Sequence, residues 1–426
     1  MNVSLPKGAE YELRTLKKKS TKVNFDGNKF ERIESADQIS STVRLAYQGK
    51  MSQASGTKPG SEEALIEKAA AMVKYGSELE VPFVGAAEVK KLDLADEAAM
   101  TSKEMIEQME GFVSDVRSID SRLTVSAGIR CEFTDLSHKT STGFNGSYRK
   151  SVWTCGGSID LMQGDDLLSL WEFKRSIRPD FNLKEMKEVL ARKLEHAKTV
   201  VPFEAGAYPV IFSPGEVGYI VNPFFQSLNG QWVHRKVSPW GDKLGQELLD
   251  KGFSLVDDGS INREWTSVPF DLEGTPTRRN VLVQKGRLEN LLTNRKVAAQ
   301  LNRGSSGNCS DMGISPHFLS IEPGGKSLEE LISSIDKGLL IDGTMGAWSG
   351  NPFAGIVSGT ISMGLKIEKG KIVGRVKDCM FTINAFEHFA KHFLGCSKET
   401  EQAQVMFSAA ALFPYVMLDE VVISAK

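Results

Sequence analysis

At the centre of the chain lies Tyr208-Pro-Val-Ile-Phe-Ser-Pro-Gly-Glu-Val-Gly-Tyr-Ile-Val-Asn-Pro-Phe-Phe-Gln-Ser-Leu-Asn-Gly230, a segment that joins an apolar strand to a predicted helix. The strand spans residues 210–212 and breaks at Ser213-Pro-Gly215, because proline and glycine interrupt regular structure. Over residues 217–228, apolar side chains recur on several faces, which indicates a helix that is buried on most of its surface. We therefore expect Phe224 and Phe225 to lie in the protein core.

Five later segments carry glycine-rich turns and short predicted strands. They are Gly274-Thr-Pro-Thr-Arg-Arg-Asn280, Arg303-Gly-Ser-Ser-Gly-Asn-Cys309, Gly343-Thr-Met-Gly-Ala-Trp-Ser-Gly-Asn-Pro-Phe353, Gly364-Leu-Lys-Ile-Glu-Lys-Gly-Lys-Ile-Val373 and Phe413-Pro-Tyr-Val-Met-Leu-Asp-Glu-Val-Val-Ile423. With the central segment, they resemble the motifs of the TldD/PmbA family, peptidases and peptidase-like proteins once called modulators of DNA gyrase. The resemblance covers nearly the whole chain. Each motif alone has little specificity, and their common order gives the resemblance its weight.

The resemblance is to the PmbA branch of this family, also called TldE. In the TldD branch, the helix after the central strand carries a His-Glu-x-x-x-His zinc motif. Its two histidines align with Asn222 and Ser227, and its glutamate aligns with Pro223. Zinc binding needs imidazole or thiolate ligands, and zinc-dependent hydrolysis needs a carboxylate close to the metal-bound water. The resemblance therefore implies degenerate metal-motif positions at these three residues, with no catalytic residue and no bound metal in this chain.

A second candidate metal site lies near the C-terminus. His388, His392 and Cys396 are spaced four residues apart, which is a possible zinc-ligand spacing on one helix face. Two features speak against it. The apolar stripe of the predicted helix lies opposite the histidines, so we expect them to face solvent, and Gly395 is expected to end the helix before Cys396. The TldD branch uses a late cysteine ligand followed by Gly-Lys-Glu-Gly, which Cys396-Ser-Lys-Glu-Thr matches only in part.

A possible peptide-binding site is the run Arg278-Arg-Asn280, which matches a family segment. The planar guanidinium groups of Arg278 and Arg279 could pair with a carboxylate or a peptide backbone, and Asn280 could add an amide. A structural role in a turn is an equally good interpretation.

The run Pro323-Gly-Gly-Lys-Ser327 looks like the end of a phosphate-binding loop. The complete motif needs a glycine where this chain has Ser320. Ser327 and Glu330 instead have the spacing of a helix capping box, which we prefer as the explanation.

The composition excludes several classes of protein. Of the 426 residues, Lys and Arg number 52 and Asp and Glu 54, giving a formal charge of -2 without the basic excess of a nucleic-acid binder. No apolar run is long enough to span a bilayer, and the N-terminus lacks the apolar core of a signal peptide. Five cysteines without paired spacing are typical of reduced thiols. We expect a cytoplasmic protein with no membrane or nucleic-acid partner.

The length predicts at least two domains. We place an N-terminal α+β domain at residues 1–200 and a β-rich, antiparallel, barrel-like domain at 201–426. Short β-rich runs open the chain, and helices are expected to begin after Ser61 and Thr101. Further helices are predicted over 182–200, 217–228, 242–251, 327–337 and 382–394. Because hairpins outnumber helices, the fold class is α+β rather than a doubly wound parallel sheet.

Three functional hypotheses follow. The resemblance implies a metal-free subunit of a TldD/TldE-type metallopeptidase complex, which holds unfolded peptides while a TldD-like partner supplies the zinc. The second hypothesis is a stand-alone peptide-binding or assembly protein, and the chain alone could form a homodimer. The third, least favoured, is a zinc peptidase that uses His388, His392 and Cys396.

Overall fold

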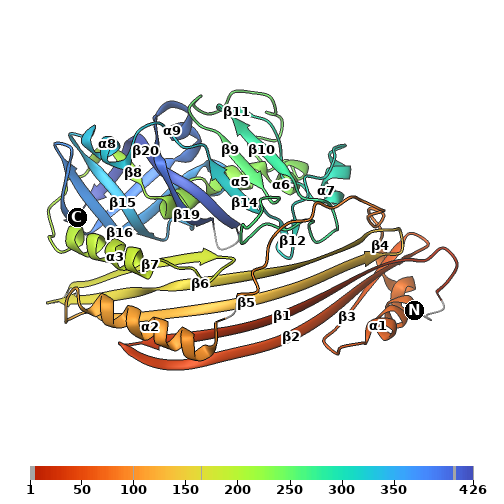
Figure 1. The fold of residues 1–426 in the computed structure, drawn as a ribbon. Coiled ribbons are helices and arrows are strands. Elements are labelled where there is room, and N and C mark those ends of the chain that lie inside the picture. Colours follow the sequence, from red (N-terminus) through yellow and green to blue (C-terminus); the bar gives the residue numbers. More distant parts are fainter. Residues whose placement is uncertain (1–4, 99, 165, 406–408, 426) are drawn as a thin grey trace. The chain divides into compact units, whose positions relative to one another are not determined.

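The computed structural model describes residues 5–98, 100–164, 166–405 and 409–425 (Figure 1). These residues form two compact units that interleave along the sequence. The first unit comprises residues 1–191 and 260–277, and the second comprises residues 192–259 and 278–426. The segment 260–277 thus belongs to the first unit, although it follows the start of the second.

The first unit is built on a seven-stranded antiparallel sheet (Figure 1). In order across the sheet, the strands are β4 (Ser77–Glu78), β3 (Lys50–Gly56), β2 (Lys29–Tyr47), β1 (Glu10–Asp26), β5 (Thr124–Thr140), β6 (Asn145–Gln163) and β7 (Asp166–Ser176). Strands β1 and β2 are much longer than the short runs predicted from the sequence. The polar stretch Lys17–Lys19 continues β1 instead of breaking it, because both neighbouring strands pair with it there.

Helices α1 (Glu62–Met72) and α2 (Ser102–Arg117), with the short η1 (Val73–Tyr75), pack against this sheet. A capping box of Thr101 and Glu104 begins α2, at the start that the sequence predicted for this helix. Ser61 precedes α1 as predicted, but its side chain makes no capping bond and donates to the Lys58 carbonyl instead. Helix α3 (Leu183–Ala197) forms within the range predicted for it and crosses from the first unit into the second.

The second unit contains an 11-stranded sheet, part of which closes into a barrel. Its strands are β8 (Gly206–Phe212), β9 (Leu255–Asp258), β10 (Arg279–Gln284), β11 (Arg287–Leu288), β14 (Phe318–Ile321), β15 (Lys337–Met345), β16 (Ile356–Glu368), β17 (Lys371–Val376), β18 (Cys379–Asn384), β19 (Phe393–Val405) and β20 (Ala409–Ala425). The small strands β12 (Cys309–Ser310) and β13 (Gly313–Ile314) pair separately. Strands β8, β15, β16, β18 and β20 form the closed ring. The predicted α+β class with a β-rich, barrel-like C-terminal part is confirmed, with parallel pairs at β8–β15 and β14–β20.

Short helices fill the spaces between these strands. They are α4 (Pro214–Ile220), α5 (Asn222–Leu228), α6 (Gly230–His234), α7 (Arg295–Gln300), α8 (Leu328–Ser333), η2 (Pro352–Ala354) and α9 (Ala385–Lys391). The helix predicted over 242–251 is wrong, because these residues form turns and Gly245 takes a left-handed conformation with φ +82. The helices predicted over 327–337 and 382–394 are shorter than expected, since β15 begins at Lys337 and β18 continues to Asn384. No helix in the described ranges is long and apolar enough to cross a membrane.

Candidate functional site

The metal-motif segment forms two helices, α4 and α5, where the sequence predicted one. Helix α5 begins at Asn222 and has Pro223 in its first turn. Proline lacks an N–H and disfavours helical geometry in the residue before it, so Pro223 opens a new helix instead of continuing α4. The predicted burial is confirmed, because Phe224 is 0% exposed and Phe225 is 6% exposed.

The three metal-motif positions lie inside the protein and hold no metal-ligating groups. Asn222 is 8% exposed and Ser227 is 0% exposed. The Ser227 hydroxyl donates to the Pro223 carbonyl at 2.8 Å, and the Ser227 carbonyl accepts from the Ser238 hydroxyl at 2.7 Å. An amide, a proline ring and a hydroxyl engaged within its own helix do not fit a zinc ion. In the part of the chain that the structure describes, no three His, Cys, Asp or Glu side chains are grouped so that they could hold a metal.

Phe224 anchors α5 in an aromatic cluster. Its ring stacks on Trp240 with centroids 5.2 Å apart, and it meets Phe389 edge-on at 5.0 Å and Phe253 at 5.8 Å. Such aromatic pairs are stabilising beyond the apolar area that they bury. Phe224, between Asn222 and Ser227, therefore serves packing.

Glu216, in helix α4 before these positions, is a buried acid that the sequence did not reveal. Burial disfavours its charged form and raises its pKa to about 7, although hydrogen bonds from Thr344 oppose the rise and the nearby Asp342 adds to it. The Thr344 hydroxyl donates to the carboxylate at 2.6 Å and its N–H donates at 3.2 Å. The carboxyl can thus hold or release a proton near neutral pH. Because Thr344 lies on β15, far along the chain, no local pattern revealed this contact.

Arg278, Arg279 and Asn280 lie where β10 begins, but their side chains have different surroundings. Arg279 is exposed, whereas Asn280 is 7% exposed. Arg278 donates a hydrogen bond to the carbonyl of Ser305. Arg278 is also exposed, so both arginines are accessible to a peptide.

Asn280 belongs to a buried polar network. Its amide donates to the Asn308 side chain at 3.3 Å, and Asn308 donates to Asp257 at 2.7 Å. The other Asp257 oxygen accepts the backbone N–H groups of His317 and Phe318 at 2.7 and 3.0 Å. Burial raises the pKa of Asp257 against these contacts. The network joins β9, β10 and β14, so Asn280 supports the structure of this sheet.

The candidate ligands near the C-terminus also serve structural roles. His388 is 8% exposed, so the expectation that it faces solvent is wrong. Its Nδ1 lies 2.9 Å from the Asn384 carbonyl oxygen, and its Nε2 lies 3.3 Å from that of Glu420. Helix α9 ends at Lys391, before His392. Cys396 lies in β19, where burial raises the pKa of its thiol to about 12 and so disfavours the thiolate that binds metal.

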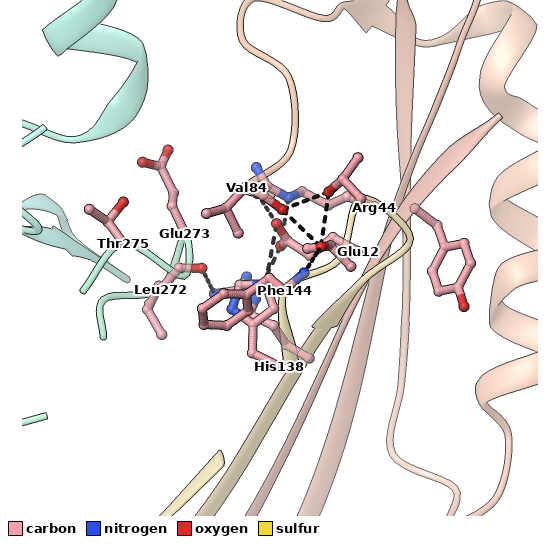
Figure 2. A network of polar contacts seen from close by, with 12 residues as sticks. Glu12, Arg44, Val84, His138, Phe144, Leu272, Glu273 and Thr275 are labelled. Carbon is pink, nitrogen blue, oxygen red and sulfur yellow. Dashed lines mark hydrogen bonds and ion pairs between the residues drawn. The ribbon is translucent and has the colours of Figure 1, made fainter. Parts of the chain in front are cut away.

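The first unit holds a second buried polar cluster, shown in Figure 2, that the sequence did not reveal. Glu12 is 1% exposed and accepts two hydrogen bonds from Arg44, at 3.0 and 2.7 Å. Burial disfavours the charged form of Glu12, but His138 and Arg44 outweigh it and lower the pKa to about 2. His138 is 0% exposed, and its Nε2 lies 3.4 Å from Glu12. The cluster joins β1, β2 and β5, whose pairing brings these distant residues together.

Comparisons with known proteins agree with these structural features. A family model of the PmbA/TldA metallopeptidase C-terminal domain matches residues 205–425. Among solved structures, TldE from Thermococcus kodakarensis is similar with a TM-score of 0.90 and 21% identity, over 98% of this chain and 97% of that one. A modulator of a DNA gyrase from Thermotoga maritima is similar with a TM-score of 0.90 and 20% identity, over 98% and 96% of the two chains. At these identities, the structural similarity demonstrates a common fold.

Sequence relatives cover a smaller part of the chain. An uncharacterized protein of Methanocaldococcus jannaschii is 29% identical over 223 residues, which are 50% of this chain and 52% of that protein. The metalloprotease PmbA homolog of Haemophilus influenzae is 26% identical over 235 residues, 53% of this chain and 48% of its own length. The chain thus spans about half the length of the curated relatives that it matches.

Proposed function

The chain belongs to the PmbA/TldD family of metallopeptidase-like proteins, and on that basis we propose that it is a non-catalytic subunit of a two-component metallopeptidase. In this proposal, a TldD-like partner with an intact His-Glu-x-x-x-His motif supplies the zinc. This chain binds no metal, completes the peptide-binding chamber and helps to hold unfolded peptides.

One observation carries the proposal: the buried state of the degenerate metal-motif positions. The Ser227 hydroxyl bonds to the Pro223 carbonyl, and Phe224 packs in the aromatic cluster. A catalytic zinc site keeps an open coordination position beside a water-activating carboxylate, and a proline at the glutamate position cannot provide one. The residues of this helix suit packing better than hydrolysis, which supports a non-catalytic role.

The alternative zinc site receives no support from the geometry. Both ring nitrogens of His388 face backbone carbonyls, and the Cys396 thiol is protonated at neutral pH. A ligand set there would require the ring to break these contacts and the thiol to ionise in a buried position. We therefore assign His388 and Cys396 to the structure of the barrel.

Co-expression with a TldD-like chain from the same source tests the proposal. The two chains should co-purify, and together they should cleave an unfolded peptide that neither cleaves alone. Bound zinc should be found in the partner, whereas pure, untagged preparations of this chain should contain well under one equivalent. Tight, stoichiometric zinc in this chain alone would contradict the assignment. Full activity of the partner alone would favour the second hypothesis, a stand-alone peptide binder.

A control variant tests whether this chain lacks only the three metal-motif residues or the rest of a zinc site as well. Replacing Asn222 with His, Pro223 with Glu and Ser227 with His restores the three motif residues. We expect no peptidase activity from this chain alone, because the remaining ligand and the groups that orient the ligands are still absent. Peptide cleavage by the restored chain would show that the rest of a catalytic site had persisted.

A further inference from the structure

A segment of the first unit runs beside the edge of β6 while held at both ends. At one end, Gly85 forms an antiparallel bridge with Gly143. At the other end, the Ser151 N–H donates to the Leu94 carbonyl at 3.1 Å. We call residues 86–93, between these two attachment points, the strap. The strap forms no strand pairing with β6 in the ranges that the structure describes.

Both ends of the strap are firmly anchored. The Val84 carbonyl accepts hydrogen bonds from the hydroxyls of Thr140 and Thr142, at 2.8 and 2.6 Å. Val84 packs with Phe144 beside the Glu12–Arg44 pair (Figure 2). At the other end, Leu94 is 1% exposed. Most of the strap between them is exposed, so its two ends fix it while its middle stands away from the sheet.

A groove of about 1180 Å³ opens between the strap and the sheet. Residues 89–93 of the strap form one wall, and the sheet forms the other through residues 145–149 of β6, residues 135–137 of β5, and Thr15 and Lys17 of β1. Its volume is above the usual range for small-molecule sites, which suits a length of chain better than a compact ligand.

The β6 wall of the groove is an unpaired strand edge. Strand β7 pairs with β6 only from Trp153 onward, so Ser147 and Arg149 have no strand pairing on that side among the described residues. Successive residues of a strand direct their N–H and C=O groups to opposite neighbours. Since the N–H of Ser151 points to Leu94, away from β5, those of Ser147 and Arg149 point to the same side, into the groove. An unpaired edge of this kind accepts an extended chain through backbone hydrogen bonds.

The groove also carries an excess of positive charge. Its lining includes Lys17, Lys90 and Lys91, none of which forms an ion pair within the described residues. The two lining carboxylates lie close to arginines, Asp93 2.8 Å from Arg263 and Asp135 3.9 Å from Arg149, which is also 3.4 Å from Glu97. The charge that remains for a ligand is therefore positive, which favours an occupant with acidic side chains.

From these observations, we propose that the groove binds an extended, acidic peptide as an added strand along residues 145–149 of β6. This inference rests on the proposed function in taking an unfolded peptide as the ligand, and it assigns that peptide a site and a preferred charge. The backbone pairing would hold peptides of many sequences, while the lysines would select among them.

Fluorescence polarisation with the purified chain alone tests the site. The probe is a short, labelled, unstructured peptide rich in Asp, Glu, Val and Thr, and its control carries Lys in place of each acid. Ser147→Pro removes one N–H from the groove edge, where proline is compatible with an unpaired strand. Ser147→Ala keeps that N–H and is the matched control. We expect about tenfold weaker binding for the proline variant, the magnitude of a lost hydrogen bond, and unchanged binding for the alanine variant.

Two further measurements do not depend on how the proline variant folds. N-methylation of alternate peptide residues should weaken binding to the unaltered chain about tenfold in one of the two registers, since only one set of N–H groups faces β6. Lys90→Glu combined with Lys91→Glu should remove the preference for the acidic peptide.

Equal binding of both peptides, or of both N-methylated registers, would overturn the inference. The binding assay needs neither the partner nor proteolysis. If the complex cleaves peptides while this groove binds none, the proposed peptide site is wrong and the proposed function still stands.

Discussion

Glu216→Gln is the substitution that most clearly separates a structural acid from an ordinary surface carboxyl. The folded chain holds the pKa of Glu216 at about 7, against 4.5 for an unperturbed glutamate. Between these two values, the folded protein retains a proton that the unfolded chain has released, so stability falls as the pH rises. At about 1.4 kcal/mol for each pH unit between the two pKa values, the loss approaches about 3 kcal/mol above pH 7.

Glutamine removes this pH dependence while preserving much of the local bonding. Its carbonyl oxygen can accept the Thr344 hydroxyl and N–H bonds that the carboxylate accepts. We therefore expect the two proteins to have similar stability near pH 5, and the glutamine variant to be more stable at pH 8 by up to about 3 kcal/mol.

Urea unfolding at a series of pH values measures this difference, and Glu322→Gln, at an exposed position, is the matched control. The free energy of unfolding of the control should follow that of the unaltered protein at every pH. If Glu216→Gln and the unaltered protein show parallel pH profiles, Glu216 is ionised in the folded state and the reasoning from its burial is wrong.

Three other substitutions test the packing and the buried charges. Phe224→Ala should lower the free energy of unfolding by about 3–5 kcal/mol in a denaturant titration. The control Met312→Ala, at a residue 78% exposed, should change it by less than about 0.5 kcal/mol. A loss below about 1 kcal/mol for Phe224→Ala would place its ring outside the core. His388→Ala should cost about 1–3 kcal/mol, because it removes a buried ring that lies against the Asn384 and Glu420 carbonyls, and a negligible cost would restore the surface assignment. In the unaltered chain, the stabilisation from Glu12 is present above pH 4.5 and is lost as the pH falls towards about 2. Glu12→Gln should therefore reduce the fall in the free energy of unfolding at acid pH. An unchanged fall would exclude this carboxylate as its source.

Features set by neighbouring residues could be predicted from the sequence. The capping boxes at Thr101 and Ser327 form as their spacing indicated. The hairpin within Gly364–Val373 also forms, since Lys369 and Gly370 both take the positive φ that its tight turn requires. In both cases, the residues that determine the structure lie within a few positions of one another.

Features set by distant strands could not be predicted. The contact between Glu216 and Thr344 depends on the parallel pairing of β8 with β15, which places helix α4, after β8, beside β15. The burial of His388 depends on the Glu420 carbonyl of β20. Helical periodicity correctly predicted that Phe389 is buried. It could not show that β20 also lies against His388, on the other face of α9.

Peptide cleavage by the reconstituted pair is the most direct test of the central claim. The rate of cleavage of an unfolded peptide is measured for this chain alone, for a TldD-like partner alone, and for the two together at equal concentration. We expect cleavage only by the pair, with its loss when a histidine of the partner's zinc motif is replaced by alanine. Cleavage by this chain alone, or an equal rate from the partner without it, would contradict the account.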